Sequence, residues 1–311
     1  MVESPLPAIV SAPLTASRPK ILAALLALCA VWGYSWIAMK IGLRHAHPFD
    51  FAAHRLVLGA LLLFGLVAAT GRRLTLPDYR TVAMLGLVQV GAFVLLSQYA
   101  LLVAGPGKTA VLTYTMPFWM LLFAAMMLGE RLRGAQWVAV AVAFAGLVLI
   151  VSPWKLTSLE GSVLAVASGA TWALAAVLSK KWPVKDADLL TITAWQLVFG
   201  AIPFVVLSLA HDHGDTAWTG EYAMALGYST VFATAAGWAL WTFVLANAPA
   251  GMAGINALGV PVFAVTASWL QLGERPTPSE FAGMALIGIA LAFLAWLGLA
   301  RAKAAPREGG S

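Results

Sequence analysis

Ten long apolar stretches divide the sequence, and short polar segments separate them. We place them at residues 20–43, 49–70, 79–103, 108–128, 134–151, 161–181, 188–210, 220–246, 251–272 and 278–300. A helix needs roughly 20 apolar residues to cross a bilayer, whereas barrel strands are about half as long and alternate apolar with polar residues. Because lipid satisfies no backbone polar group, the pattern predicts an all-α polytopic membrane protein with ten transmembrane helices.

Composition agrees with this prediction. Hydrophobic residues make up 61% of the sequence and charged residues 10%, with a mean hydropathy of +0.86. Soluble domains carry about 25% charged residues. We expect disordered tails at residues 1–19 and 301–311, and the first apolar stretch has no secretory cleavage pattern, so we expect it to be retained. The sequence contains no GxxxxGK[ST] phosphate-binding loop, which excludes ATP-driven transport by this chain alone, and we predict no cofactor.

The basic residues are distributed unevenly between the two sides of the predicted bundle. With the N-terminus inside, 13 lysines and arginines fall on inner segments and 5 on outer segments, while Arg55 lies within the second helix. This bias follows the positive-inside rule. It accounts for the net charge of +6 without a nucleic-acid partner and predicts that both termini face the cytoplasm.

The predicted topology can be tested with reporter fusions at the C-terminus. A reporter that is active only in the cytoplasm should be active there, and one that is active only in the periplasm should not. Activity of the periplasmic reporter alone would contradict the ten-helix topology.

The sequence repeats itself. MPFWMLLFAAMMLGER at 116–131 aligns without gaps with VPVFAVTASWLQLGER at 260–275, an offset of 144 residues. AVWGYSWIAMK at 30–40 matches ATWALAAVLSK at 170–180, and LVLGA at 56–60 matches LVFGA at 197–201. Three blocks in the same order indicate a duplication. The halves are predicted to be residues 20–155 and 156–300.

Each half holds five predicted helices, and an odd number means that the second half enters the membrane from the opposite side. Inverted repeats are typical of secondary transporters, which bind solute near the midplane between the halves. A membrane enzyme or receptor that retains an old duplication is an alternative, but the sequence has no HExxH or GxSxG motif and no acid pair within a membrane segment.

Together these features resemble the drug/metabolite transporter superfamily, EamA type: the two five-helix repeats, a tryptophan midway along helices one and six, a mid-helix proline in helices four and nine, and the LGER ends. Trp32 and Trp172 resemble most the aromatic amino-acid exporter (YddG) group. The resemblance implies a bacterial inner-membrane exporter of small metabolites, mainly aromatic and large apolar amino acids. A multidrug exporter of the same superfamily is the alternative. We expect a monomer with no partner beyond substrate and lipid.

Tryptophans near the middle of helices are the first candidates for the solute site. A tryptophan that faces lipid at the midplane leaves its N–H unpaired, so Trp32 and Trp172 are expected to face protein or a cavity. Trp238 and Trp241 are the next candidates, and Trp36 fits either the cavity or the interface. Packing alone is the alternative role for each.

Polar residues at membrane depth complete the predicted site. Arg55 lies about two turns inside helix two, where a charge is costly without a partner or water, and His54 is its neighbour. Lys40 is expected to bind a substrate carboxylate at the cavity rim or to extend toward the interface. The uncharged candidates are Gln98, Tyr99, Tyr114 and Asn256. Each of these can instead bond between helices.

The distribution of acidic residues disfavours cationic substrates. All 13 lie in tails, loops or at helix ends, and none at the bilayer centre. The outer HDHGD segment at 211–215 has two histidines but no third ligand, so we predict a solvated loop and no metal site.

Pro117 and Pro261 occupy equivalent places near the centres of helices four and nine. Each removes a backbone hydrogen bond, so we predict a kink at both. Their repetition in inverted halves predicts paired hinges.

Overall fold

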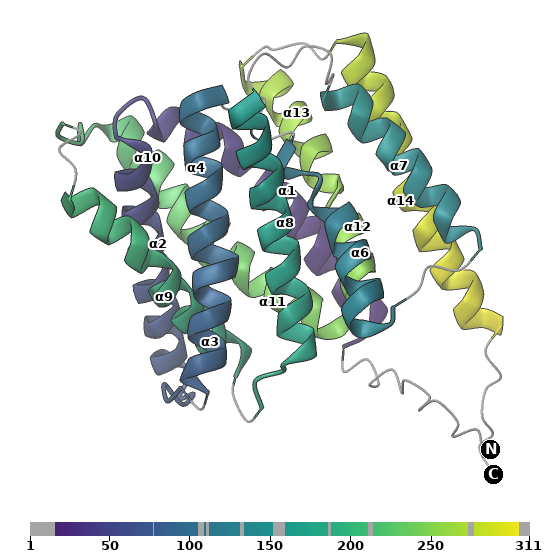
Figure 1. Cartoon of the computed structure of the whole chain (residues 1–311), viewed down its shortest axis with the longest axis horizontal. Helices are drawn as coiled ribbons and strands as arrows, with labels where there is room; N and C mark the ends of the chain where they lie inside the picture. The colour runs from purple at the N-terminus through teal and green to yellow at the C-terminus, as the bar shows by residue number, and fades with distance from the viewer. Residues whose placement is uncertain are drawn as a thin grey trace.

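The computed structural model describes residues 16–76, 78–104, 109, 112–130, 134–151, 159–185, 188–210, 214–272 and 277–304. Its regular elements are α1 (Arg18–Gly42), α2 (Pro48–Ala69), α3 (Tyr79–Leu85), η1 (Gly86–Ala92), α4 (Phe93–Ala104), α6 (Met116–Leu128), α7 (Gln136–Val151), α8 (Leu159–Lys181), α9 (Leu189–Ala210), α10 (Gly220–Tyr228), η3 (Ser229–Ala236), α11 (Gly237–Asn247), α12 (Ala250–Asn256), α13 (Gly259–Leu272) and α14 (Pro278–Ala304). In the described part of the chain all of these are helical (Figure 1).

The all-α polytopic prediction is confirmed. Within the described residues, seven helical segments are long and apolar enough to cross a membrane, and three shorter apolar helices cover Met116–Leu128, Gln136–Leu149 and Phe281–Leu294. These ten segments lie at the ten predicted stretches. Helix α14 continues to Ala304, four residues into the expected tail. Helix α1 begins at Arg18, two residues inside the expected N-terminal tail. Residues 1–15 and 305–311, residues 211–213 of the HDHGD segment and the end of the second LGER motif lie outside the described residues.

Equivalent helices of the two halves have equivalent neighbours. Helix α1 of the first half packs along α13 of the second, and α8 of the second half packs along α6 of the first. In the same way α8 lies against η1 and α4, while α1 lies against η3 and α11. Helices α2 and α9 pair directly, as do α7 and α14, which lie together at one edge of the bundle (Figure 1). Because α1 and α8 each pack against helices of the other half, the interface between the halves runs through the middle of the bundle.

Two π-helical segments were not expected from the sequence. Residues of η1 interrupt the third predicted helix and residues of η3 interrupt the eighth. Because Gly86 and Ser229 begin them, the segments are offset by 143 residues, close to the offset of the sequence repeat. A π-helical turn bonds each N–H to the carbonyl five residues back and occurs often at functional sites. Segment η1 packs against α9 and α8 of the second half, and η3 packs against α2 and α1 of the first.

The predicted kinks at Pro117 and Pro261 are instead helix interruptions. A turn at residues 114–115 precedes α6, and Pro117 is in the first turn of that helix. A turn at residues 257–258 separates α12 from α13, and Pro261 is the third residue of α13. Proline fits the first helical turn because an N–H there has no helical acceptor to lose. The expected helix over 108–128 is therefore interrupted at residues 114–115, with helical residues described before the turn at 109 and 112–113 and α6 after it.

Candidate functional site

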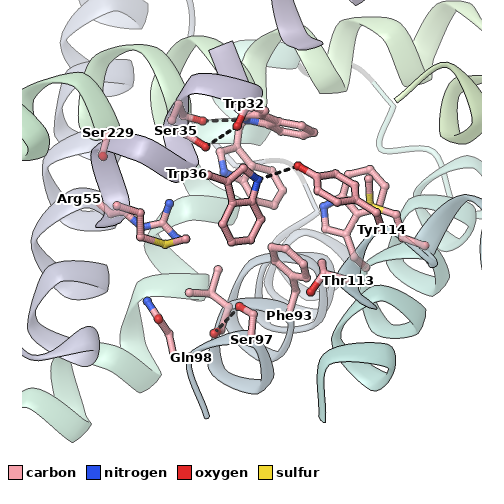
Figure 2. Close-up of a pocket in the computed structure, with 16 residues that line it drawn as sticks. Trp32, Ser35, Trp36, Arg55, Phe93, Ser97, Gln98, Thr113, Tyr114 and Ser229 are labelled. Atoms are coloured by element: carbon pink, nitrogen blue, oxygen red, sulfur yellow. Dashed lines mark hydrogen bonds between the residues drawn. The ribbon is translucent and has the colours of Figure 1, made fainter. Parts of the chain in front are cut away.

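A cavity lies where the two halves meet. Its volume is about 110 Å³, measured at the centres of water-sized molecules, where one water needs roughly 10–15 Å³. The cavity therefore has room for several waters or a small solute. Its wall comes from both halves: Trp32, Ser35, Trp36, Met39, Arg55, Phe93, Val94, Ser97, Gln98, Thr113, Tyr114 and Met116 from the first, and Trp172, Ser229, Ala233 and Trp238 from the second (Figure 2).

Tryptophan rings form one part of this wall. The ring of Trp32 lies with its centroid 6.1 Å from those of Trp172, Trp238 and Trp241. Trp172 contacts Trp241 at 4.2 Å between centroids and Phe93 at 6.5 Å. Except for the closer Trp172–Trp241 pair, these separations fall within the range of about 4.5–7 Å typical of attractive aromatic pairs. Because α1, α8 and α11 each supply rings, the cluster joins the two halves around the cavity.

Hydrogen bonds fix the two tryptophans of α1. The indole Nε1 of Trp32 donates to the carbonyl of Ala233, inside η3, at 3.0 Å. The indole Nε1 of Trp36 donates to the hydroxyl of Tyr114 at 2.7 Å (Figure 2). Buried indole N–H groups need such partners. Each ring is therefore held in place by its partner, Ala233 for Trp32 and Tyr114 for Trp36, while it lines the cavity.

The polar part of the wall lies toward α2 and α4. Arg55 lines the cavity from α2, and its Nε is buried without a hydrogen-bond partner. Gln98 from α4 donates its Nε2 to the carbonyl of Pro48 at 3.2 Å, which leaves its Oε1 buried and without a partner. Figure 2 shows both side chains on one side of the cavity and Tyr114 across from them. The cavity is thus amphipathic, with aromatic rings and a cationic donor.

Comparison with known proteins decides the family. The sequence matches the EamA-like transporter family over residues 19–152 and again over residues 159–296. The protein belongs to this family.

Individual relatives of this EamA-like transporter agree with that assignment. The chain is 27% identical to "Uncharacterized transporter YoaV" of Bacillus subtilis over 275 residues, covering 86% of this chain and 94% of that protein. It is 26% identical to "Probable amino-acid metabolite efflux pump" of Escherichia coli over 279 residues, covering 84% and 90%. A solved crystal structure with 18% identity superimposes with a TM-score of 0.78 and covers 90% of this chain and 98% of that one. Family and relatives indicate a transporter rather than an enzyme.

Six of the eleven predicted site residues line the cavity of this EamA-like transporter. They are Trp32, Arg55, Gln98, Tyr114, Trp172 and Trp238. Trp241 lies behind Trp172 and is 1% exposed. The roles of these residues in binding remain predictions.

The other four predicted residues lie elsewhere. Lys40 lines a separate hollow between α1, α10 and α13. The Nδ1 of His54 lies 2.7 Å from the hydroxyl of Tyr222 on α10. Tyr99 is exposed beside Phe49. Asn256 ends α12, and its carbonyl accepts a hydrogen bond from the thiol of Cys29 at 3.6 Å. The structure does not bring these four side chains to the cavity wall.

Glu130, two residues after the end of α6, was not among the predicted site residues. Its Oε1 accepts from the backbone N–H of Ala250 at 3.1 Å and its Oε2 from that of Gly251 at 3.2 Å. In the sequence this glutamate is part of the LGER motif, whereas in the structure it binds the first residues of α12. It therefore ties α6 to α12 across the two halves.

Gly237 controls the position of Trp32 and provides a test of the cavity wall. A Cβ at Gly237 would overlap Nε1 of Trp32 and lie 3.0 Å from its Cδ1, whereas a Cβ at Gly227 meets nothing within 4 Å. We expect Gly237→Ala to push the indole out of place, lowering both the melting temperature in detergent and transport, at a cost of about 1–3 kcal/mol. Gly227→Ala, in the same predicted span, should leave both unchanged. Equal behaviour of the two variants would contradict this placement of Trp32.

Proposed function

We propose that the protein exports neutral amino acids, mainly aromatic and large apolar ones, across the bacterial inner membrane by alternating access and without ATP. One observation carries this proposal: the cavity at the interface of the halves is lined both by tryptophan rings and by Arg55, whose Nε is buried without a hydrogen-bond partner. An amino acid with an apolar side chain can place its ring or hydrocarbon against the tryptophans and its carboxylate against Arg55. The name of the Escherichia coli relative, "Probable amino-acid metabolite efflux pump", agrees with this substrate class.

The interrupted helices provide positions at which the protein can bend to open the cavity to one side of the membrane or the other. Helices α6 and α13 begin just after turns, and their prolines cannot donate the hydrogen bond that would make each helix continuous. Half of a helix can then move without breaking a regular hydrogen-bond ladder. We propose Pro117 and Pro261 as paired hinges, one for each side of the membrane. The narrower assignment to the aromatic amino-acid exporter group is part of this proposal.

Flux measurements in proteoliposomes test the proposal. Liposomes that contain the purified protein and unlabelled phenylalanine should accumulate labelled phenylalanine, leucine and tryptophan by counterflow without added ATP. Liposomes without protein provide the baseline. Cationic dyes are the matched alternative cargo, because a multidrug exporter would move them. Dye flux with no amino-acid flux would replace this function with the multidrug alternative, and a folded protein that moves neither would contradict both.

A further inference from the structure

Arg55 is a charge without a counter-charge. It lies in α2, a 22-residue helix that is long enough and apolar enough to span a membrane. Neither a hydrogen bond nor an ion pair joins its guanidinium to another side chain in the described part of the chain, and its Nε is buried. An arginine at membrane depth is costly unless water or an anion neutralises it. The guanidinium lines the cavity, so its partner has to come from there.

Neighbouring carboxylates are already engaged and do not supply that partner. Asp50, one turn earlier on α2, accepts a hydrogen bond from the hydroxyl of Ser208 on α9. Glu221 on α10 lies 3.2 Å from the Nε2 of His45. Among the described residues, no aspartate or glutamate lines the cavity. The protein therefore offers the cavity one full positive charge and no negative charge.

The other polar groups of the cavity are neutral. The free Oε1 of Gln98 is an acceptor, because the amide nitrogen is committed to the carbonyl of Pro48. The hydroxyl of Ser35 donates to the carbonyl of Trp32 and that of Ser97 donates to the carbonyl of Val94. Hydrogen bonds to a charged partner are stronger than those between neutral groups. A substrate ammonium group thus finds neutral acceptors and no counter-charge, while a carboxylate finds the opposite charge of a guanidinium.

We infer that this transporter recognises its substrates by a carboxylate and an apolar ring, and that the α-amino group is dispensable. The substrate class then includes aromatic monocarboxylates without an amino group as well as amino acids. Aromatic amines, which share the ring and lack the carboxylate, are excluded because their charge repels that of Arg55. Arginine suits this role because its planar fork binds a carboxylate through two parallel hydrogen bonds. The inference rests on the proposed function and specifies which part of the substrate is recognised.

Three ligands that share one phenyl ring test the inference. Phenylalanine carries both charges, 3-phenylpropanoate only the carboxylate, and phenethylamine only the ammonium group. Each competes with labelled phenylalanine for binding to the purified protein. We expect 3-phenylpropanoate to compete at least as well as unlabelled phenylalanine, and phenethylamine to compete at least about tenfold more weakly.

Variants assign the discrimination to Arg55. Arg55→Gln should weaken binding of both carboxylates by about tenfold to a hundredfold and remove the preference over phenethylamine. Arg55→Lys should retain part of the preference, since it keeps the charge and loses the fork. Arg80→Gln, an exposed arginine at the start of α3, is the matched control and should bind as the wild type does. Melting temperatures of all variants show that each is folded.

The outcomes separate the inference from the proposed function. If phenylalanine binds while 3-phenylpropanoate does not, or if phenethylamine competes equally, the inference is wrong and the proposed function stands. If a folded wild-type protein binds none of the three ligands, the proposed function falls and the inference falls with it. The comparison of ligands uses the wild-type protein alone, so it decides the question even if the substitutions at Arg55 prevent folding.

Discussion

Replacing Trp172 with alanine is expected to lower amino-acid counterflow by at least about tenfold, whereas replacing Trp296 with alanine should leave it near the wild-type rate. Trp172 lines the cavity, contacts three other rings and is 2% exposed. Trp296 lies on α14 and is 60% exposed. Removal of a buried aromatic side chain costs about 3–5 kcal/mol, and it also removes one wall of the cavity.

Protein yield and a second substitution separate binding from folding in this experiment. Both variants are compared at equal amounts of folded protein in the liposomes. Trp172→Phe keeps a ring at the cavity and should retain more transport than Trp172→Ala. If Trp172→Ala and Trp296→Ala reduce transport equally, the ring of Trp172 serves packing alone.

The second large effect is expected at Glu130. Its two oxygens hold the first backbone N–H groups of α12. About one turn after the cavity-lining Met116, Met120 of α6 lies so close to α12 that a Cβ at Gly254 would be 2.8 Å from its sulfur. Helices α6 and α12 pack against each other, and we expect this packing to close the pathway on this side of the cavity. Each charge-assisted hydrogen bond contributes about 1.5–3 kcal/mol. Glu130→Ala should therefore open this end of the pathway.

Thiol labelling measures the opening. In a Cys29→Ser background, a cysteine at Met120, which is 0% exposed, reports access from the face at which α1 begins. We expect Glu130→Ala to increase its rate of labelling by a membrane-impermeant maleimide by about tenfold or more. Glu160→Ala, an exposed carboxylate in the first turn of α8, is the control and should not change the rate. An unchanged rate in Glu130→Ala would show that the bonds of this carboxylate to α12 do not keep this end of the pathway closed.

The sequence was sufficient to predict the helices and the central tryptophans. Apolar stretches of membrane-spanning length can only be helices in lipid, and the structure has apolar helices at all ten positions. Trp32 and Trp172 were predicted to face protein or a cavity because an indole N–H at the midplane needs a partner. Their ring centroids lie 6.1 Å apart, and Trp32 donates to Ala233.

Lys40 was expected at the cavity rim or toward the interface, and the geometry of its helix explains why it does not reach the cavity. Trp32, Trp36 and Lys40 follow each other at intervals of four residues, and a helix has 3.6 residues per turn. Each step therefore rotates the side chain by about 40°, and two steps by about 80°. The two tryptophans line the cavity, while Lys40 points to the separate hollow beside α10 and α13.

The π-helical segments and the helix interruptions lie at contacts between residues far apart in the sequence. The hydrophobic pattern of one segment carries no information about such contacts. The carbonyl of Ala233 in η3 is bonded by Trp32, which is 201 residues away. A proline such as Pro117 fits both a kink and a first helical turn. Near this interruption, Gly169 of α8 approaches so closely that a Cβ there would lie 2.6 Å from the carbonyl oxygen of Thr113. The approach of α8 accompanies the interruption and is invisible in either sequence segment alone.

Protection of a cavity cysteine by substrate tests the central claim, that the cavity between the two halves is the transport site. In the Cys29→Ser background, Ser97→Cys places a thiol in the cavity wall, and Thr70→Cys places one at the exposed end of α2. We expect phenylalanine to slow maleimide labelling of Ser97→Cys in proportion to the fraction of protein that has phenylalanine bound, and to leave Thr70→Cys unaffected. Unchanged labelling of Ser97→Cys in a variant that still transports phenylalanine would contradict the claim.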